Sequence, residues 1–141
     1  MSAILPSAAR TTSGTFVLPS SFGNVAAACF GLIVSAAATD AGDTLDVYVQ
    51  HSPDGGTTWD DFIHFTQVLG NGGAKAFIAQ WNALASPESE LHVPSDAAMA
   101  AGVLQGPVGN TVRIKWVIVN AGAANQSFTF SVSLDAVRRA L

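Results

Sequence analysis

A glycine-rich turn between two strand-like segments constrains the fold of this chain more than any other feature of its sequence. The turn spans residues 52–59 and has the spacing Ser-x-Asp-x-Gly-x-Thr-Trp. A short carboxylate such as Asp54 accepts hydrogen bonds from the backbone N–H groups of a turn, and glycine adopts positive φ at little cost. The ring of Trp59 is suited to cover such a turn. The pattern predicts a β-hairpin in an all-β protein, stabilised by Ser52, Asp54, Gly56, Thr58 and Trp59.

Alternating apolar and polar residues predict strands on both sides of this hairpin. Residues 44–50, 111–119 and 128–135 alternate clearly, as strands with one buried face do. The apolar run 25–34 favours a strand buried on both faces, and Cys29 within it is expected to be a buried, inert thiol. Seven or eight strands with short turns predict a single antiparallel β-sandwich of jelly-roll type. An immunoglobulin-like sandwich stays open as the alternative topology.

The 141 residues have room for one domain, with two segments that lack strand periodicity. Residues 1–13 are small and polar and are expected to be a flexible N-terminal arm. Residues 14–141 form the sandwich domain, in which the pattern dissolves into a long loop over 82–110. A loop of this length is usually functional or in contact with a partner. Within it, residues 95–101 are expected to form one helical turn with Ser95 or Asp96 as N-cap.

The composition excludes several classes of function. Only 11% of the residues are charged, six are basic and the net charge is −4, which argues against nucleic-acid binding. No apolar run approaches the roughly 20 residues of a membrane-spanning helix, and the first residues lack the pattern of a signal peptide. One cysteine cannot form an internal disulfide and fits synthesis in a reducing cytoplasm. A chain with 49% hydrophobic and only 11% charged residues is typical of a subunit whose surface is covered in a larger assembly.

Four carboxylates near the hairpin are the densest acidic group: Asp46, Asp54, Asp60 and Asp61. Such a group suits glycoside hydrolysis or a Ca²⁺ site. Asp60 and Asp61 are adjacent on a strand, however, so they face opposite sides and do not form an acid/base pair. We therefore expect a structural role, with Asp54 bound in the turn and with Asp60 and Asp61 on a solvated shoulder of the hairpin.

The remaining candidates for chemistry are equally weak. His51 and His64 flank the hairpin and could share a metal ion, but no third ligand is evident, and histidines that bond locally are commoner. There is no nucleophile elbow and no glycine-rich phosphate loop. We expect no enzyme, no cofactor and no metal.

The aromatic residues could form a carbohydrate platform, although most fall on the core faces of strands. Trp81, at the entrance to the long loop, is the one expected to make a surface contact. The candidate partner contacts are Arg10, Trp81, Leu84, Met99 and Leu104.

The hairpin residues resemble the Asp-box of sialidases and other surface β-proteins. The arginine cluster and the Tyr/Glu nucleophile pair of sialidases have no counterpart here, so a hydrolase fragment is disfavoured. From about residue 30 to 138 the chain is similar to small virion proteins of tailed bacteriophages. The segments that carry this resemblance are 45–59, 65–67, 112–116 and 125–133. Residues 83–106 are outside it.

This resemblance implies a non-enzymatic head decoration or cement protein that binds the major capsid protein or other virion proteins. It implies a homo-oligomer, most simply a homotrimer, located in the virion after synthesis in the host cytoplasm. The N-terminal arm and the long loop would make the contacts. A neck or tail component and a carbohydrate-binding module for surface attachment stay open as alternatives.

Overall fold

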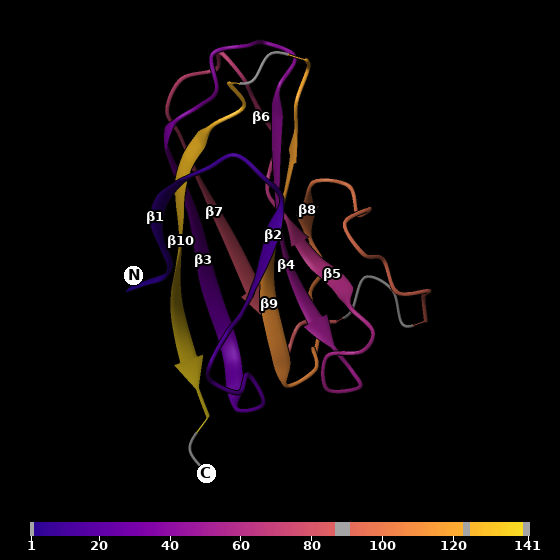
Figure 1. Ribbon diagram of the computed structural model, residues 1–141. Helices are drawn as coiled ribbons and strands as arrows, with labels where there is room; N and C mark the ends of the chain where they lie inside the picture. Colours follow the sequence, from indigo (N-terminus) through magenta and orange to yellow (C-terminus); the bar gives the residue numbers. More distant parts are fainter. Residues whose placement is uncertain (1, 87–90, 123–124, 140–141) are drawn as a thin grey trace.

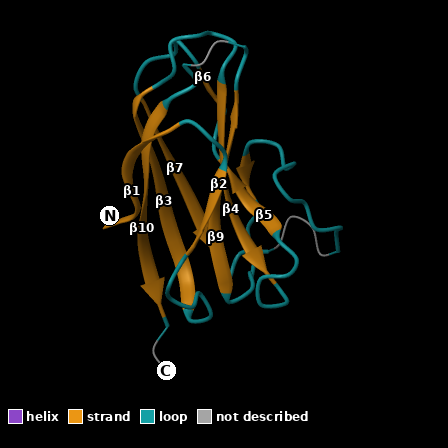
Figure 2. Ribbon diagram, in the orientation of Figure 1, coloured by secondary structure: helices purple, strands orange, loops and turns teal. Residues whose placement is uncertain are grey.

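The computed structural model describes residues 2–86, 91–122 and 125–139, which form ten β-strands and no helix (Figures 1 and 2). The strands are β1 (Ser2–Arg10), β2 (Gly14–Val17), β3 (Val25–Ala36), β4 (Thr44–Ser52), β5 (Asp60–His64), β6 (Val68–Leu69), β7 (Lys75–Asn82), β8 (Gly102–Val103), β9 (Thr111–Val119) and β10 (Phe128–Arg138). The predicted all-β class is confirmed. Within the described residues there is thus no helix that could span a membrane.

The strands form two antiparallel sheets that pack against each other (Figure 1). Sheet A has the order β1-β10-β3-β7. Sheet B has the order β2-β9-β4-β5-β8, and β6 also pairs with β4. Figure 1 shows sheet A on the left and sheet B on the right, with the long loop between β7 and β9 beyond the right-hand sheet.

The pairing of the eight main strands is nested. The first pairs with the last (β1 with β10), the second with the seventh (β2 with β9), the third with the sixth (β3 with β7), and β4 with β5 at the centre. A long hairpin rolled up in this way, with its strand pairs alternating between two sheets, is a jelly roll. The jelly-roll prediction is therefore confirmed, and the immunoglobulin-like alternative is excluded.

Aromatic side chains fill the space between the sheets. Phe30, Phe62, Phe128 and Phe130 are fully buried or nearly so. The ring of Phe62 meets Phe30 and Trp81 edge-on, with centroids 6.2 and 5.7 Å apart. Trp81 is only 2% exposed, and its Nε1–H donates to the carbonyl of Gly106 at 3.0 Å. The surface role predicted for Trp81 is wrong, because alternation along β7 turns this side chain inward.

The N-terminal segment is a strand and not the flexible arm that its composition suggested. Ser2–Arg10 form β1, which covers the edge of β10 with two register shifts. Leu5 is 5% exposed and anchors β1 in the core. The Arg10 guanidinium stacks on the ring of Phe130 at 4.5 Å and donates to its carbonyl at 2.6 Å. Two anchors separated by small residues are enough to order a segment that has little hydrophobic periodicity.

The strand β3 is buried on one face only. Ala28, Phe30, Leu32 and Val34 point into the core, whereas Ile33 is 42% exposed. Cys29 lies on this outer face and is partly exposed, so its predicted burial is wrong. The sequence predicted burial on both faces because the outward-facing residues of this strand are also small or apolar.

Candidate functional site

The turn between β4 and β5 is closed by the side chains of Ser52 and Asp54. Asp54 Oδ1 accepts the backbone N–H of Thr58 at 2.7 Å and that of Thr57 at 3.2 Å, and Ser52 Oγ accepts the N–H of Gly56 at 2.7 Å. The hydrogen bonds to the carboxylate, first from the backbone of Thr58 and then from the side chains of Thr58 and Ser52, lower the pKa of Asp54 to about 2. Gly56 has a φ of 109°, a conformation that a side chain would strain. Because Asp54 is occupied by this turn, it is not free to bind a substrate.

Trp59 connects the turn to sheet B. A Cβ at Gly56 would lie 3.6 Å from the Trp59 ring, which places the ring against the turn as expected. The Arg113 guanidinium from β9 lies 4.1 Å from the centre of the same ring, a cation–π contact. Arg113 Nε also donates to the side-chain carbonyl of Gln50 at 2.7 Å. The Trp59 ring thus links the turn to Arg113 of β9.

Asp61 is the most heavily hydrogen-bonded side chain of the region, and it is fully buried. It accepts five hydrogen bonds, from Gln50 Nε2 at 2.7 Å, Ser95 Oγ at 3.2 Å, and the backbone N–H groups of Ala97, Ala98 and Met99 at 3.0, 3.0 and 3.1 Å. It therefore fastens residues 95–99 of the long loop to the sheet. The expectation of a solvated shoulder is wrong, since the loop covers this carboxylate.

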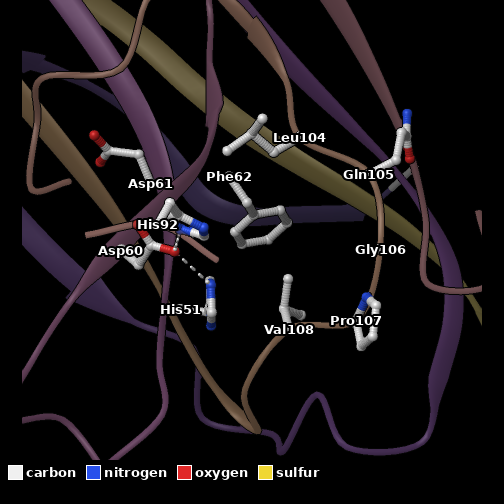
Figure 3. A pocket seen from close by; sticks show the side chains of 10 residues that line it. All are labelled: His51, Asp60, Asp61, Phe62, His92, Leu104, Gln105, Gly106, Pro107 and Val108. Atoms are coloured by element: carbon white, nitrogen blue, oxygen red, sulfur yellow. Dashed lines mark hydrogen bonds and ion pairs between the residues drawn. The ribbon is translucent and has the colours of Figure 1, made fainter. Parts of the chain in front are cut away.

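Asp60 binds a different set of groups. Its Oδ2 accepts from His92 Nε2 at 2.7 Å and from His51 Nε2 at 3.2 Å, and its Oδ1 accepts the N–H of Ser95 at 2.9 Å. Figure 3 shows the two imidazoles converging on this carboxylate. Asp60 is 5% exposed, so the expected solvated position is wrong for this residue too. The two adjacent aspartates thus hold two successive parts of the same loop.

The hydrogen bonds around His51 define its protonation state. Its Nδ1 accepts the backbone N–H of Gly109 at 2.9 Å, so the ring proton resides on Nε2, which donates to Asp60. Burial lowers the pKa of His51, an effect that Asp60 only partly opposes. The Nδ1 lone pair of His51 accepts a hydrogen bond, and its Nε2 carries the ring proton. The ring therefore has no free lone pair to bind a metal ion or to act as a general base.

The space beside these side chains is small. His51, Asp60 and His92 border a cavity of about 60 Å³, which Phe62, Leu104 and Val108 close on its other side (Figure 3). Sites for small molecules usually have about 300 Å³ or more. The cavity is therefore too small for a substrate.

His64 lies away from this group. It pairs with Tyr48 of β4, on whose ring it stacks with centroids 4.1 Å apart. Its two nitrogens face the carbonyl of Met99 and Oδ1 of Asp46, each at 2.8 Å. His51 and His64 consequently do not share a site. Among residues 2–86, 91–122 and 125–139, no group of three or more His, Cys, Asp or Glu is arranged to hold a metal ion.

The long loop has more structure than its sequence indicated. It contains β8, which pairs with β5, and residues 95–99 wrap around Asp61. The predicted helical turn at 95–101 is absent, and Ala97 has a φ of 57°, because the backbone bends to point successive N–H groups at the carboxylate. Residues 87–90 of the predicted loop lie outside the described residues. The sequence signal for this arrangement is the pair of acidic residues beside Phe62-Ile63, since carboxylates next to buried positions need donors.

The other candidate contacts occupy different environments. Met99 and Leu104 are half-buried, and the N–H of Leu104 donates to the carbonyl of Phe62 at 2.8 Å. Arg10 is held by Phe130, as described above. Leu84 is 73% exposed in the turn after β7. Among these candidates, Leu84 therefore remains the most accessible to a partner.

The outer face of sheet A is not covered by any other described segment of the chain. Its outward positions on β10, β3 and β7 form four rows in the ladder: Ser131–Ile33–Ala76, Ser133–Gly31–Ile78, Asp135–Cys29–Gln80 and Val137–Ala27–Asn82. Asp135 is the single charged residue in these rows. Ile78 and Val137 are 61% and 64% exposed. An open groove of about 600 Å³ runs over the last two rows.

The outer face of sheet B differs from this surface in charge and in cover. Lys115 and Arg113 of β9 lie on it, and Lys115 Nζ binds Asp96 of the long loop at 2.8 Å. The loop residues bound to Asp61 cover the neighbouring part of β4 and β5. Within the described residues, sheet A is thus the sheet whose outer face lacks such a cover.

Comparison with known proteins adds little to this description. No protein-family model matches the sequence, and no curated protein matches it. Among solved structures, the fold is similar to a chain in the cryo-EM structure of broad bean stain virus, with 13% sequence identity and a TM-score of 0.43. The similarity covers 86% of this chain and 62% of that chain, so this chain spans less than two thirds of its length. A likeness this distant carries no argument about function.

Proposed function

We propose that this chain is a non-enzymatic structural protein of a virus particle, most specifically a head decoration or cement protein that binds the capsid shell as a homo-oligomer. The observation that carries the proposal is the outer face of sheet A, whose rows mix apolar with small polar side chains, hold one charged residue and lack a cover among the described residues. A monomer that functions alone usually keeps more charge on such a surface. Jelly rolls serve in viral capsids but also in lectins and cupins, so the fold alone does not decide the function.

The chemistry of the polar side chains supports a structural role. The four carboxylates that looked most like a catalytic group each accept hydrogen bonds from their own chain. They are Asp54 in the turn, Asp60 and Asp61 in β5, and Asp46 beside His64. His51 has both ring nitrogens engaged. Groups held in this way stabilise a fold and have no spare capacity to transfer protons to a substrate.

A decoration protein would stabilise its shell by mass action. Binding to the assembled shell and not to its free subunits adds a free energy that disassembly has to overcome. With 11% charged residues, such a contact would be mainly apolar, and its affinity would change little with salt concentration. The family resemblance implies the major capsid protein as the partner and three copies per oligomer.

The principal alternative within a particle is a position in the neck or tail, which differs in copy number. A carbohydrate-binding module is less well supported, because Trp81 is buried and the Trp59 ring is already in contact with the Arg113 guanidinium. A buried indole offers no face on which a sugar ring could stack.

Quantitative mass spectrometry of purified particles from the source tests the proposal. A ratio near one copy per shell subunit is the expected result. A handful to a few dozen copies per particle would instead indicate the neck or tail. Absence from particles would refute the virion role, and binding to a glycan array would then favour the carbohydrate-binding alternative.

A further inference from the structure

We propose that the outer face of sheet A is a self-complementary interface, through which two copies of this chain pack sheet against sheet. The two-fold axis runs along β3, between the two facing sheets. The inference specifies the homo-oligomer of the proposed function as a two-fold dimer, in place of the three copies that the family resemblance implies, and it rests on that function only for its biological setting. Its test needs no virus particle.

The charge of the face permits contact with an identical surface. A homotypic interface brings each charge close to its own copy, so a face with several like charges repels itself. The four rows hold one charged residue, Asp135, at the β10 side of the face. Rotation about β3 moves the partner's Asp135 to the opposite side, so the two carboxylates do not meet.

The rows place complementary side chains opposite each other. A two-fold rotation about β3 lays β7 of one copy over β10 of the other at the same level. Ile78 then lies over the partner's Ser133, because both occupy the row of Gly31. In the next row, the Gln80 amide lies over the partner's Asp135 and can donate a hydrogen bond to this carboxylate.

The sizes of the side chains on this face also suit the two-fold arrangement. Ile78 is 61% exposed and projects from β7, whereas β10 offers the smaller Ser131 and Ser133 at the matching levels. On β3, Gly31 and Cys29 keep two rows of the centre low, and Ile33, which is 42% exposed, would pack against its own copy at the axis. A projecting residue on one side and small residues on the other interlock with their own copy when the rotation exchanges the two sides.

The size of the face agrees with a weak dimer. With the axis along β3, three strands (β10, β3 and β7) face the partner; at about 4.8 Å apart and about eight residues long at 3.3 Å per residue, they cover roughly 380 Å² on each copy. Two copies would bury about 760 Å² in total, the size of a weak and transient contact. We therefore expect a dimer that forms at micromolar or higher concentration and is reinforced when neighbours hold the copies together.

Sedimentation velocity of the full chain, from micromolar to millimolar concentration, provides the test. The wild-type protein should show a monomer–dimer equilibrium. Ile78→Glu should raise the dimer Kd by about tenfold or more, because it places an unpaired charge in each half of the contact. Val119→Glu is the matched control, since Val119 is 50% exposed on the other sheet, and its Kd should equal that of the wild type. Circular dichroism checks that both variants are folded.

A second measurement locates the contact. Cys29 is the single cysteine of the chain and lies near the proposed axis. A bismaleimide that spans about 10 Å, the usual separation of packed sheets, should link two copies through Cys29 in the wild type and in Val119→Glu. Ile78→Glu should give little product.

Three results would overturn the inference: a wild-type protein that stays monomeric, a trimer, or a dimer that Ile78→Glu leaves intact. A monomeric wild type whose Ile78→Glu variant is no longer incorporated into particles would show that the face binds a different protein and not a second copy. Dimerisation by a chain that is absent from particles would refute the proposed virion role while leaving this interface in place.

Discussion

Asp61 accepts the backbone N–H of Met99 at 3.1 Å, which ties a fully buried carboxylate of β5 to a loop residue 38 positions further along the chain. The neighbouring Ala97 and Ala98 donate to the same carboxylate. A single side chain therefore organises the part of the long loop that covers sheet B.

Replacing this carboxylate should loosen the loop and destabilise the protein. Asp61→Asn puts an NH₂ group opposite backbone donors, so buried N–H groups lose their acceptor at a cost of about 3 kcal/mol or more in the free energy of unfolding. Denaturant unfolding measures this loss, and hydrogen exchange should accelerate at Ala97, Ala98 and Met99. Asp96→Asn is the control in the same loop. Its side chain is 50% exposed, so the change should cost less than about 1 kcal/mol. Equal effects of the two substitutions would contradict the role given to Asp61.

His51 should make the protein less stable in mild acid. Burial lowers its pKa from 6.5, so the unfolded chain takes up a proton at a higher pH than the folded one. Its contribution to stability is therefore present above about pH 6.5 and is lost as the pH falls toward the lower folded-state pKa. The wild type should lose stability between pH 7 and pH 5, and His51→Gln should reduce this loss. His92→Gln is the control, because the His92 side chain is 38% exposed. Ring ¹⁵N chemical shifts of His51 should show the proton on Nε2; a proton on Nδ1 would contradict the assignment.

Asp54 should act in the same direction as His51, but at a lower pH. Hydrogen bonds in the turn lower its pKa from 3.8 to about 2, so the folded state favours the ionised form. The stabilisation is present above about pH 3.8 and is lost as the pH falls toward 2. Asp54→Asn should lower the Tm at pH 6, and the difference from the wild type should shrink through this window. Asp40→Asn, at a turn carboxylate to which no described residue donates a hydrogen bond, should give a smaller and flatter difference. An unchanged Tm for Asp54→Asn at pH 6 would remove the stabilising role of this side chain.

The N-terminal strand should contribute to stability. Leu5 is 5% exposed, so Leu5→Ala should lower the free energy of unfolding by about 2 kcal/mol or more. Leu84→Ala makes the same chemical change at a position that is 73% exposed and should stay within about 0.5 kcal/mol of the wild type. Chemical denaturation of both variants provides the comparison. A flexible arm would make the two substitutions equally neutral.

Much of the architecture could be predicted because it depends on local pattern. The alternation in residues 44–50 and 111–119 follows from strands with one buried face, and the turn chemistry at Ser52 and Asp54 is confined to a few neighbouring residues. Predictions failed where small apolar residues point outward. Cys29 looked buried because the outward residues around it are also uncharged. Hydrophobicity separates core from solvent, but it does not separate core from a surface that is itself apolar.

The candidate site was largely beyond reach for a different reason. Asp60 and Asp61 were recognised as an acidic pair, but their partners lie 32 to 38 residues away in sequence. Such contacts depend on where a long loop returns, and no periodicity encodes that path. The same holds for Arg10, which reaches β10 across 120 positions.

The amino-acid sequence by itself determined the all-β class, the hairpin at residues 52–59 and the low charge of the surface, because each follows from residue type and short-range spacing. Only the tertiary structure decided that β1 joins sheet A, that two buried aspartates hold the long loop, and that no described segment covers the outer face of sheet A. These features depend on which distant segments meet when the nested hairpin rolls up, and that is a property of the packed chain as a whole.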